Sequence, residues 1–79
     1  MMNVLVKVYN MSKYNEESKK VAEVEYNNIK GYEVKMIEDE EIYNMGFDEV
    51  DEYKEYLILT LEDGETSTFK NSHVDMFRI

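Results

Sequence analysis

The chain of 79 residues contains no cysteine and no proline. Without cysteine, neither a disulfide nor a thiolate zinc site is available to stabilise the fold, and this lack fits a reducing compartment. Without proline, the chain has no polyproline linker or docking motif. The three glycines, Gly31, Gly46 and Gly64, stand far apart, so the sequence has no glycine-rich loop of the kind that cradles phosphates.

Long apolar runs are also missing. No stretch approaches the roughly 18 apolar residues of a membrane-spanning helix, and residues 1–7 lack the basic and apolar regions of a signal peptide. We therefore expect a soluble, cytoplasmic protein with no membrane partner. Hydrophobic residues make up 43% of the chain, which favours a folded protein over a disordered one. The length predicts a single domain over residues 1–79.

The sequence has one histidine, His73, beside Ser72 and close to Asp75. A hydrolytic triad needs these three residue types to converge on one reacting atom, and neighbours along a turn rarely do so. Paired carboxylates are abundant, but a chain of this length leaves little depth for a catalytic cleft. We therefore interpret His73 as a corner residue and predict a protein that is not an enzyme.

A calcium loop is the one metal site that the spacing suggests. Residues 41–52 have the length of an EF-hand loop, with Gly46 sixth and Glu52 twelfth, but Tyr43 and Met45 occupy positions that must supply side-chain oxygens. We therefore predict no specific metal and no cofactor. Direct binding to nucleic acid is disfavoured as well, because the lysines are scattered and a net charge of −9 repels phosphate.

Negative charge is what the sequence has in abundance, and it is concentrated in one segment. Between Glu38 and Glu55, nine carboxylates stand against one lysine, so this segment carries −8 of the chain's net charge of −9. Residues 1–37 hold six basic and five acidic side chains, and residues 56–79 hold two and four. A concentrated field of one sign on a small domain is evidence about partners rather than about fold.

Alternation of apolar and polar residues predicts β-strands in the N-terminal half. A helix over Glu16–Ile29 is the competing interpretation for one of them, although its valines and strict alternation favour a strand. Asn27-Asn28 interrupts the pattern. A segment that is apolar on both faces predicts a central strand. The predicted strands are Val4–Val8, Ala22–Tyr26, Tyr32–Met36, Tyr56–Leu61, Thr66–Lys70 and, after a tight corner at Asn71-Ser72, Val74–Ile79.

Asp63-Gly64 is the strongest hairpin signal in the chain, because a two-residue type I′ turn needs positive φ angles at both central residues. A loop of two residues predicts the register of the strands on either side. Glu62 then faces Glu65, Leu61 faces Thr66, and Ile58 faces Phe69.

This order of elements resembles that of small SH3-like barrels over most of the chain. The resemblance implies a mainly β fold, a small five-stranded, partly open SH3-like barrel or curled antiparallel sheet, with one short helix or ordered acidic loop around residues 48–54. Peptide-binding SH3 domains hold proline-rich ligands in a groove that contains a tryptophan. This chain has no tryptophan, so that activity is not implied.

The small size, the lack of cysteine, the many Tyr, Asn, Glu and Lys residues and the clustered acidity resemble small proteins of phages and mobile elements. Anti-CRISPR and anti-restriction proteins of this type act as DNA mimics. The resemblance implies a basic protein partner, a nuclease or DNA-binding effector in the bacterial cytoplasm. The partner-binding candidates are Glu38, Asp39, Glu40, Glu41, Tyr43, Phe47, Asp48, Glu49, Asp51, Glu52, Glu55, Glu62, Asp63 and Glu65. The alternative is a small β-barrel adaptor of a mobile element, with an acidic loop that only solubilises it.

Overall fold

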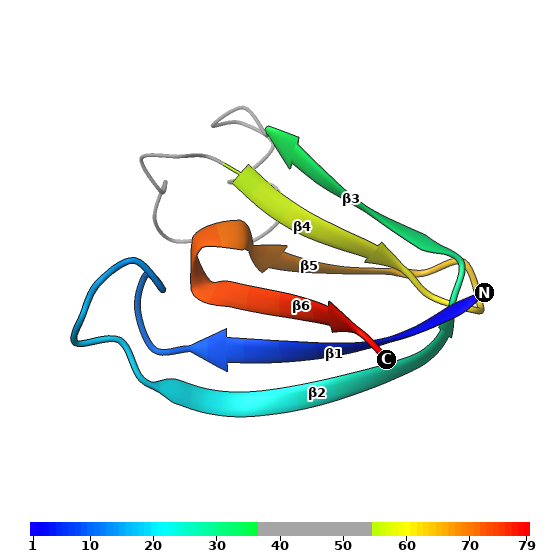
Figure 1. Cartoon of the computed structure of the whole chain (residues 1–79). Coiled ribbons are helices and arrows are strands. Elements are labelled where there is room, and N and C mark those ends of the chain that lie inside the picture. The colour runs from blue at the N-terminus through cyan, green and yellow to red at the C-terminus, as the bar shows by residue number, and fades with distance from the viewer. Residues whose placement is uncertain (37–54) are drawn as a thin grey trace.

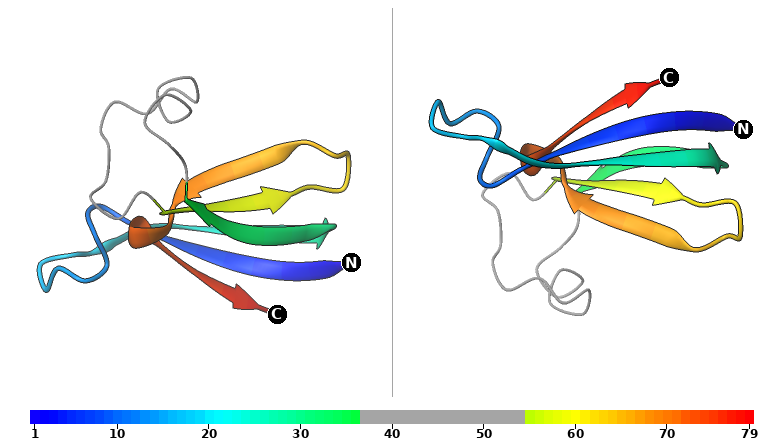
Figure 2. Two further views of the ribbon diagram at one scale, coloured as in Figure 1. Left: turned by 90° about the horizontal axis from the view of Figure 1, so that it is seen from above. Right: turned by 90° about the horizontal axis from the view of Figure 1, so that it is seen from below.

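A computed structural model describes residues 1–36 and 55–79 of the chain, which form two three-stranded antiparallel sheets (Figure 1). The strand order is β2-β1-β6 in one sheet and β3-β4-β5 in the other. In both views of Figure 2 the strands diverge from the side of the molecule that carries a 3-10 turn, η1. The elements are β1 (Met2–Tyr9), β2 (Lys20–Ile29), β3 (Gly31–Met36), β4 (Glu55–Thr60), β5 (Thr66–Lys70), η1 (Asn71–His73) and β6 (Val74–Arg78).

The mainly β prediction is therefore confirmed, whereas the count of five strands that the SH3-like resemblance implies is wrong. Six strands are present, one at each of the six predicted segments, and β2 and β3 belong to different sheets. The short helix or ordered loop predicted around residues 48–54 lies outside the described residues.

β1 is the central strand of the first sheet and shows why the alternating valines fold as they do. Val4 and Val6 have no exposed surface and face the second sheet with Val8. The residues between them point to the outer face. There Lys7 lies opposite Glu23 of β2 on one side and opposite Asp75 of β6 on the other. Opposite charges in neighbouring cross-strand positions stabilise this row.

β2 is a strand, as its alternation predicts, and the competing helix does not form. The strand continues through Asn27-Asn28 to Ile29, past the predicted end at Tyr26, although the pair does interrupt its regular pairing with β1. Met2 pairs with Ile29 and Val4 with Tyr26, so the two asparagines form a bulge within the strand. Asn28 has a φ of 57°, and its N–H donates to Asn3 Oδ1 at 2.9 Å.

A single residue, Lys30, connects β2 to β3 and carries the chain from one sheet to the other. Its N–H donates to the carbonyl of Thr60 on β4 at 2.8 Å. The preceding Ile29 is fully buried. The corner therefore closes the two sheets around an apolar side chain.

The core lies between the two sheets and consists of aliphatic side chains from both. β4 is buried on both of its faces, as predicted for Tyr56–Leu61, because Leu57 and Leu59 face the core while Tyr56 is fully buried on the opposite face. The buried cluster comprises Val4, Val6, Ile29, Leu57, Leu59 and Val74.

The hairpin between β4 and β5 has a three-residue loop, which corrects the predicted register. The N–H of Leu61 donates to the carbonyl of Glu65 at 2.8 Å, and the N–H of Gly64 donates to the carbonyl of Leu61 at 3.0 Å. Gly64 has a φ of 89°, as expected for a three-residue loop that ends in a left-handed residue. Consequently Glu62 does not face Glu65, and Leu61 does not face Thr66.

The change of one residue in the loop decides which side chain reaches the core. Leu57, rather than Ile58, lies opposite Phe69, and Thr60 lies opposite Thr66. Because successive side chains of a strand point to opposite faces, a shift of one residue exchanges the two faces. The observed register places Phe69 on the core side, where it packs against the buried cluster.

Replacing Gly64 tests the conformation of this loop. A Cβ at Gly64 meets no atom within 4 Å, so the cost of Gly64→Ala is that of the left-handed backbone alone, about 1–2 kcal/mol of unfolding free energy. Gly31→Ala is the matched control, because its Cβ is equally unhindered and its backbone is extended. We expect this second change to stabilise by about 0.5–1 kcal/mol. Urea unfolding of both variants measures the difference, and equal stabilities would contradict the loop geometry.

Candidate interaction surfaces

Four of the fourteen predicted partner-binding residues lie in the part of the chain that the structure describes. Glu55 begins β4 and is partly buried, while Glu62, Asp63 and Glu65 are exposed on the β4–β5 hairpin. The other ten lie outside the described residues: Glu38, Asp39, Glu40, Glu41, Tyr43, Phe47, Asp48, Glu49, Asp51 and Glu52.

The structure does not bring Glu55 together with the hairpin acids. Glu55 pairs with Met36 of β3, so the segment 37–54 leaves and rejoins the described fold at this pair. The hairpin follows the opposite end of β4 (Figure 1). Glu62 lies seven residue steps after Glu55, which at about 3.3 Å per step in an extended chain span about 23 Å. Glu55 and the hairpin acids therefore lie at two different ends of the described fold, which we call the η1 end and the hairpin end.

An open groove of about 460 Å³ lies at the hairpin end. It brings a third carboxylate, Glu25 of β2, to the two that the hairpin supplies. Its apolar lining includes Tyr26, whose ring meets Phe69 edge to face with centroids 6.3 Å apart and whose hydroxyl lies 3.2 Å from Ser67 Oγ. The described lining residues are Glu25, Tyr26, Asn27, Leu61, Glu62 and Asp63.

The hairpin loop is held by its own polar groups. Asp63 Oδ1 accepts a hydrogen bond from the N–H of Glu65 at 3.0 Å, which, together with the loop bonds to Leu61, fixes the backbone that carries the carboxylates. Sequence reasoning found the hairpin acids but missed Glu25, which lies 37 positions before Glu62. No local signal in the sequence places Glu25 beside the hairpin, because the two come together only through the packing of distant segments.

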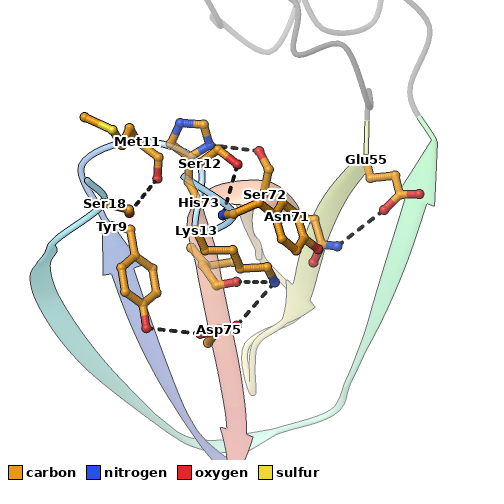
Figure 3. Close-up of polar contacts among 12 residues, drawn as sticks. Tyr9, Met11, Ser12, Lys13, Ser18, Glu55, Asn71, Ser72, His73 and Asp75 are labelled. Atoms are coloured by element: carbon orange, nitrogen blue, oxygen red, sulfur yellow. Dashed lines mark hydrogen bonds and ion pairs between the residues drawn. The ribbon is translucent and has the colours of Figure 1, made fainter. Parts of the chain in front are cut away.

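At the η1 end, Lys13 attaches the loop of residues 10–19 to the start of β6 (Figure 3). Lys13 Nζ donates to the carbonyl of Val74 at 2.9 Å and lies 3.3 Å from Asp75 Oδ1. The backbone N–H of Lys13 donates to the carbonyl of Ser72. The second carboxylate oxygen of Asp75 accepts the hydroxyl of Tyr9 at 3.0 Å. Loop, β1 and β6 thus share one polar network.

The two pKa shifts resolved among the described residues follow from such contacts. The hydrogen bond to Asp75 raises the pKa of the Tyr9 phenol, and partial desolvation and the negative charge of Asp75 act in the same direction. On β2, the hydrogen bond from Lys20 lowers the pKa of Glu23, and the positive charge of Lys20 adds to this effect. The Lys20 Nζ lies 2.6 Å from Glu23 Oε1.

Two of the three residue types of a hydrolytic triad, Ser72 and His73, are in contact on η1. Ser72 Oγ lies 2.9 Å from His73 Nδ1, and the Ser72 side chain is buried (Figure 3). The carboxylate of Asp75, however, binds Tyr9 and Lys13. Asp75 therefore does not complete a serine–histidine–aspartate relay in this arrangement.

A smaller cavity of about 300 Å³ lies beside this network. Its described lining comes from the 10–19 loop, β4 and η1: Tyr14, Glu55, Asn71 and Ser72. Asn71 Nδ2 donates to Glu55 Oε2 at 3.4 Å, and the ammonium of Lys13 lies 5.5 Å from the centroid of the Tyr14 ring. Among the described lining residues, Glu55 supplies the one carboxylate.

Within residues 1–36 and 55–79, no three His, Cys, Asp or Glu side chains gather closely enough to hold a metal ion. No helix in these ranges is both long and apolar enough to cross a membrane. Comparisons with protein-family models, with curated proteins and with solved structures find no match for this chain.

Replacing Asp75 tests the η1-end network through Tyr9. Asp75→Asn keeps an oxygen that can accept the phenol hydrogen bond but removes the negative charge, so we expect the pKa of Tyr9 to fall toward its ordinary value. NMR titration of the tyrosine ring carbons measures this pKa. Glu17→Gln, at an exposed turn, is the control and should leave it unchanged.

The raised pKa of Tyr9 also predicts how stability depends on pH. A phenol whose pKa is higher in the folded than in the unfolded protein stabilises the fold at neutral pH, and this contribution is lost as the pH rises above about 10. The unfolding free energy of the wild type should therefore fall more steeply in this range than that of Tyr9→Phe. Parallel curves for the two proteins would show that the Tyr9–Asp75 contact adds no stability.

Proposed function

We propose that this protein is a non-enzymatic interaction protein whose acidic surface binds a basic groove of a nucleic-acid-processing protein. It inhibits that partner by occupying the place of DNA phosphates. The observation that carries the proposal is the concentration of charge, since residues 38–55 hold −8 of the net −9. Closely spaced carboxylates approach the charge density of a DNA duplex, which carries one negative charge per roughly 1.7 Å of axis.

Residues 38–55 also contain apolar and aromatic side chains among the carboxylates, namely Ile42, Tyr43, Phe47, Val50 and Tyr53. In protein interfaces, complementary charge steers association and sets specificity, while a few buried aromatic anchors provide most of the affinity. In the proposed complex, Tyr43 and Phe47 are these anchors.

The groove at the hairpin end gives this proposal a structural basis within the described residues. Glu25, Glu62 and Asp63 surround an apolar lining that includes Tyr26 and Leu61. Lysine and arginine side chains fit such a groove, because their aliphatic stems pack on apolar surface while their charged ends reach carboxylates. The groove therefore serves as a secondary contact for a basic partner.

We further infer that the two sheets belong to the SH3-like type of partly open barrel. When β2 and β3 are counted as one strand bent at Lys30, the fold has five strands. The 3-10 turn before the last strand and the pairing of β1 with β6 support this assignment.

Neutralising the acids in two places tests the proposed function. The immobilised protein should capture a nucleic-acid-binding protein from a bacterial lysate, and high salt should release it. Neutralising four charges in the acidic segment should weaken the affinity for the captured protein about tenfold or more. The estimate assumes that each carboxylate loses one exposed ion pair with the partner, which contributes at least a few tenths of a kcal/mol. The variant carries Glu38→Gln, Asp39→Asn, Glu40→Gln and Glu41→Gln.

The contribution of the hairpin is tested by a pair of variants with equal charge. Glu62→Gln/Glu65→Gln should weaken binding by a smaller factor, whereas Glu16→Gln/Glu17→Gln, at the exposed turn of the 10–19 loop, should not change it. Binding that is equally tight in the acidic-segment variant and the wild type would show that the charge is not the interface.

The cavity at the η1 end favours a second candidate function, a small adaptor that binds through its barrel rather than through its acids. Tyr14 is 71% exposed and lines this cavity. Under this alternative, Tyr14→Ala abolishes capture while the charge-neutralised variants retain it. The proposed function gives the opposite pattern.

A further inference from the structure

β3 lies at the outer edge of its sheet, with β4 on one side and, among the strands that the structure describes, none on the other (Figure 1). Its pairing with β4 is regular from Gly31 to Met36. On the face shared with Leu57 and Leu59, Tyr32, Val34 and Met36 are between 50% and 63% exposed. Glu33 and Lys35 are exposed on the other face.

We propose that β3 pairs antiparallel with β3 of a second copy of this chain, about a two-fold axis that passes through Val34. Val34 then lies opposite Val34 of the second copy, Tyr32 opposite Met36, and Glu33 opposite Lys35. The β3-β4-β5 sheets of the two copies then join into one continuous sheet of six strands. Because of the two-fold symmetry, the Tyr32–Met36 and Glu33–Lys35 pairs each occur twice, and the Val34–Val34 pair on the axis occurs once.

Charge complementarity identifies the second copy as the occupant of this edge. In the proposed register both cross-strand pairs on one face join a carboxylate to an ammonium, and the other face joins apolar side chains, including a methionine and a tyrosine. A shift of two residues in either direction places Glu33 opposite Glu33 or Lys35 opposite Lys35. A shift of one residue brings apolar and charged side chains to the same face. One register therefore satisfies the whole strand.

The charge of the strand itself points to the same edge. Residues 30–36 carry two lysines and one glutamate, although the chain as a whole has a net charge of −9. The residues that pair in the proposed dimer are therefore not acidic, although Glu38–Glu41 follow them closely in the sequence. The edge strand β2 differs, because bulges or irregularities interrupt its pairing near both ends, and such irregular edges discourage the addition of a further strand.

Charge reversal at β3 tests the proposal by sedimentation equilibrium over a range of protein concentrations. The wild type should form a dimer of about twice its mass of 9.5 kDa. Glu33→Lys or Lys35→Glu places like charges opposite each other in both pairs, and each should weaken dimerisation about tenfold. The double variant Glu33→Lys/Lys35→Glu restores opposite charges and should dimerise as the wild type does. Glu16→Lys, at an exposed turn of the 10–19 loop, is the control for the change in net charge.

A cysteine at the two-fold axis provides a second readout. The chain has no cysteine, so Val34→Cys introduces the single thiol. Directly opposite Cβ atoms in an antiparallel pair lie about 4.5–5.5 Å apart, close enough for a disulfide after a small adjustment. Val34→Cys should therefore form a cross-linked dimer rapidly in air, and Val21→Cys, which is also exposed, should not.

Three results would overturn the proposal. The first is a wild-type monomer at all concentrations, which would leave the β3 edge to a strand of another protein. The second is a dimer that the single charge reversals do not weaken or that the double variant does not restore. The third is cross-linking of Val21→Cys as fast as that of Val34→Cys.

Discussion

The burial of six aliphatic side chains between two small sheets is the constraint on which the rest of the described structure depends. A domain of this size has a small core, and this chain has no disulfide to support it. Each irregular feature of the fold lets strands from both sheets reach that core. The corner at Lys30 closes one side around Ile29, the three-residue hairpin turns Phe69 inward, and η1 leads directly into the buried Val74.

The distribution of charge allows the two sheets to pack on the aliphatic core, because the strands carry little net charge. Residues 1–36 hold six basic and five acidic side chains. On the outer face of the first sheet, Lys7 lies between Glu23 and Asp75. Most of the excess acid belongs to the connection between β3 and β4 and to the β4–β5 hairpin. A connection can carry many like charges at low cost to the fold, since its side chains need not share a packed interface.

The strands were predictable because alternation and β-branched residues reflect the burial of one face, as in Val4–Val8 and Ala22–Tyr26. The central position of β4 was predictable because both of its faces are apolar. The hairpin register was not, because Asp63-Gly64 suits a two-residue loop and Gly64 can equally end a three-residue loop. The observed three-residue loop is the one that places Phe69 against the core. The bulge at Asn27-Asn28 and the position of Glu25 depend on contacts between distant segments. All fourteen predicted binding residues stay predictions, and the ten between Glu38 and Glu52 also lie outside the described residues.

The central claim is that the acidic surface takes the place of nucleic acid on its partner. The most direct measurement is the affinity of this protein for the captured partner at increasing concentrations of duplex DNA that the partner binds. Competition for one groove predicts an apparent dissociation constant that rises linearly with DNA concentration, without a plateau. A plateau, or a stable complex that contains the partner, the DNA and this protein together, would contradict the account.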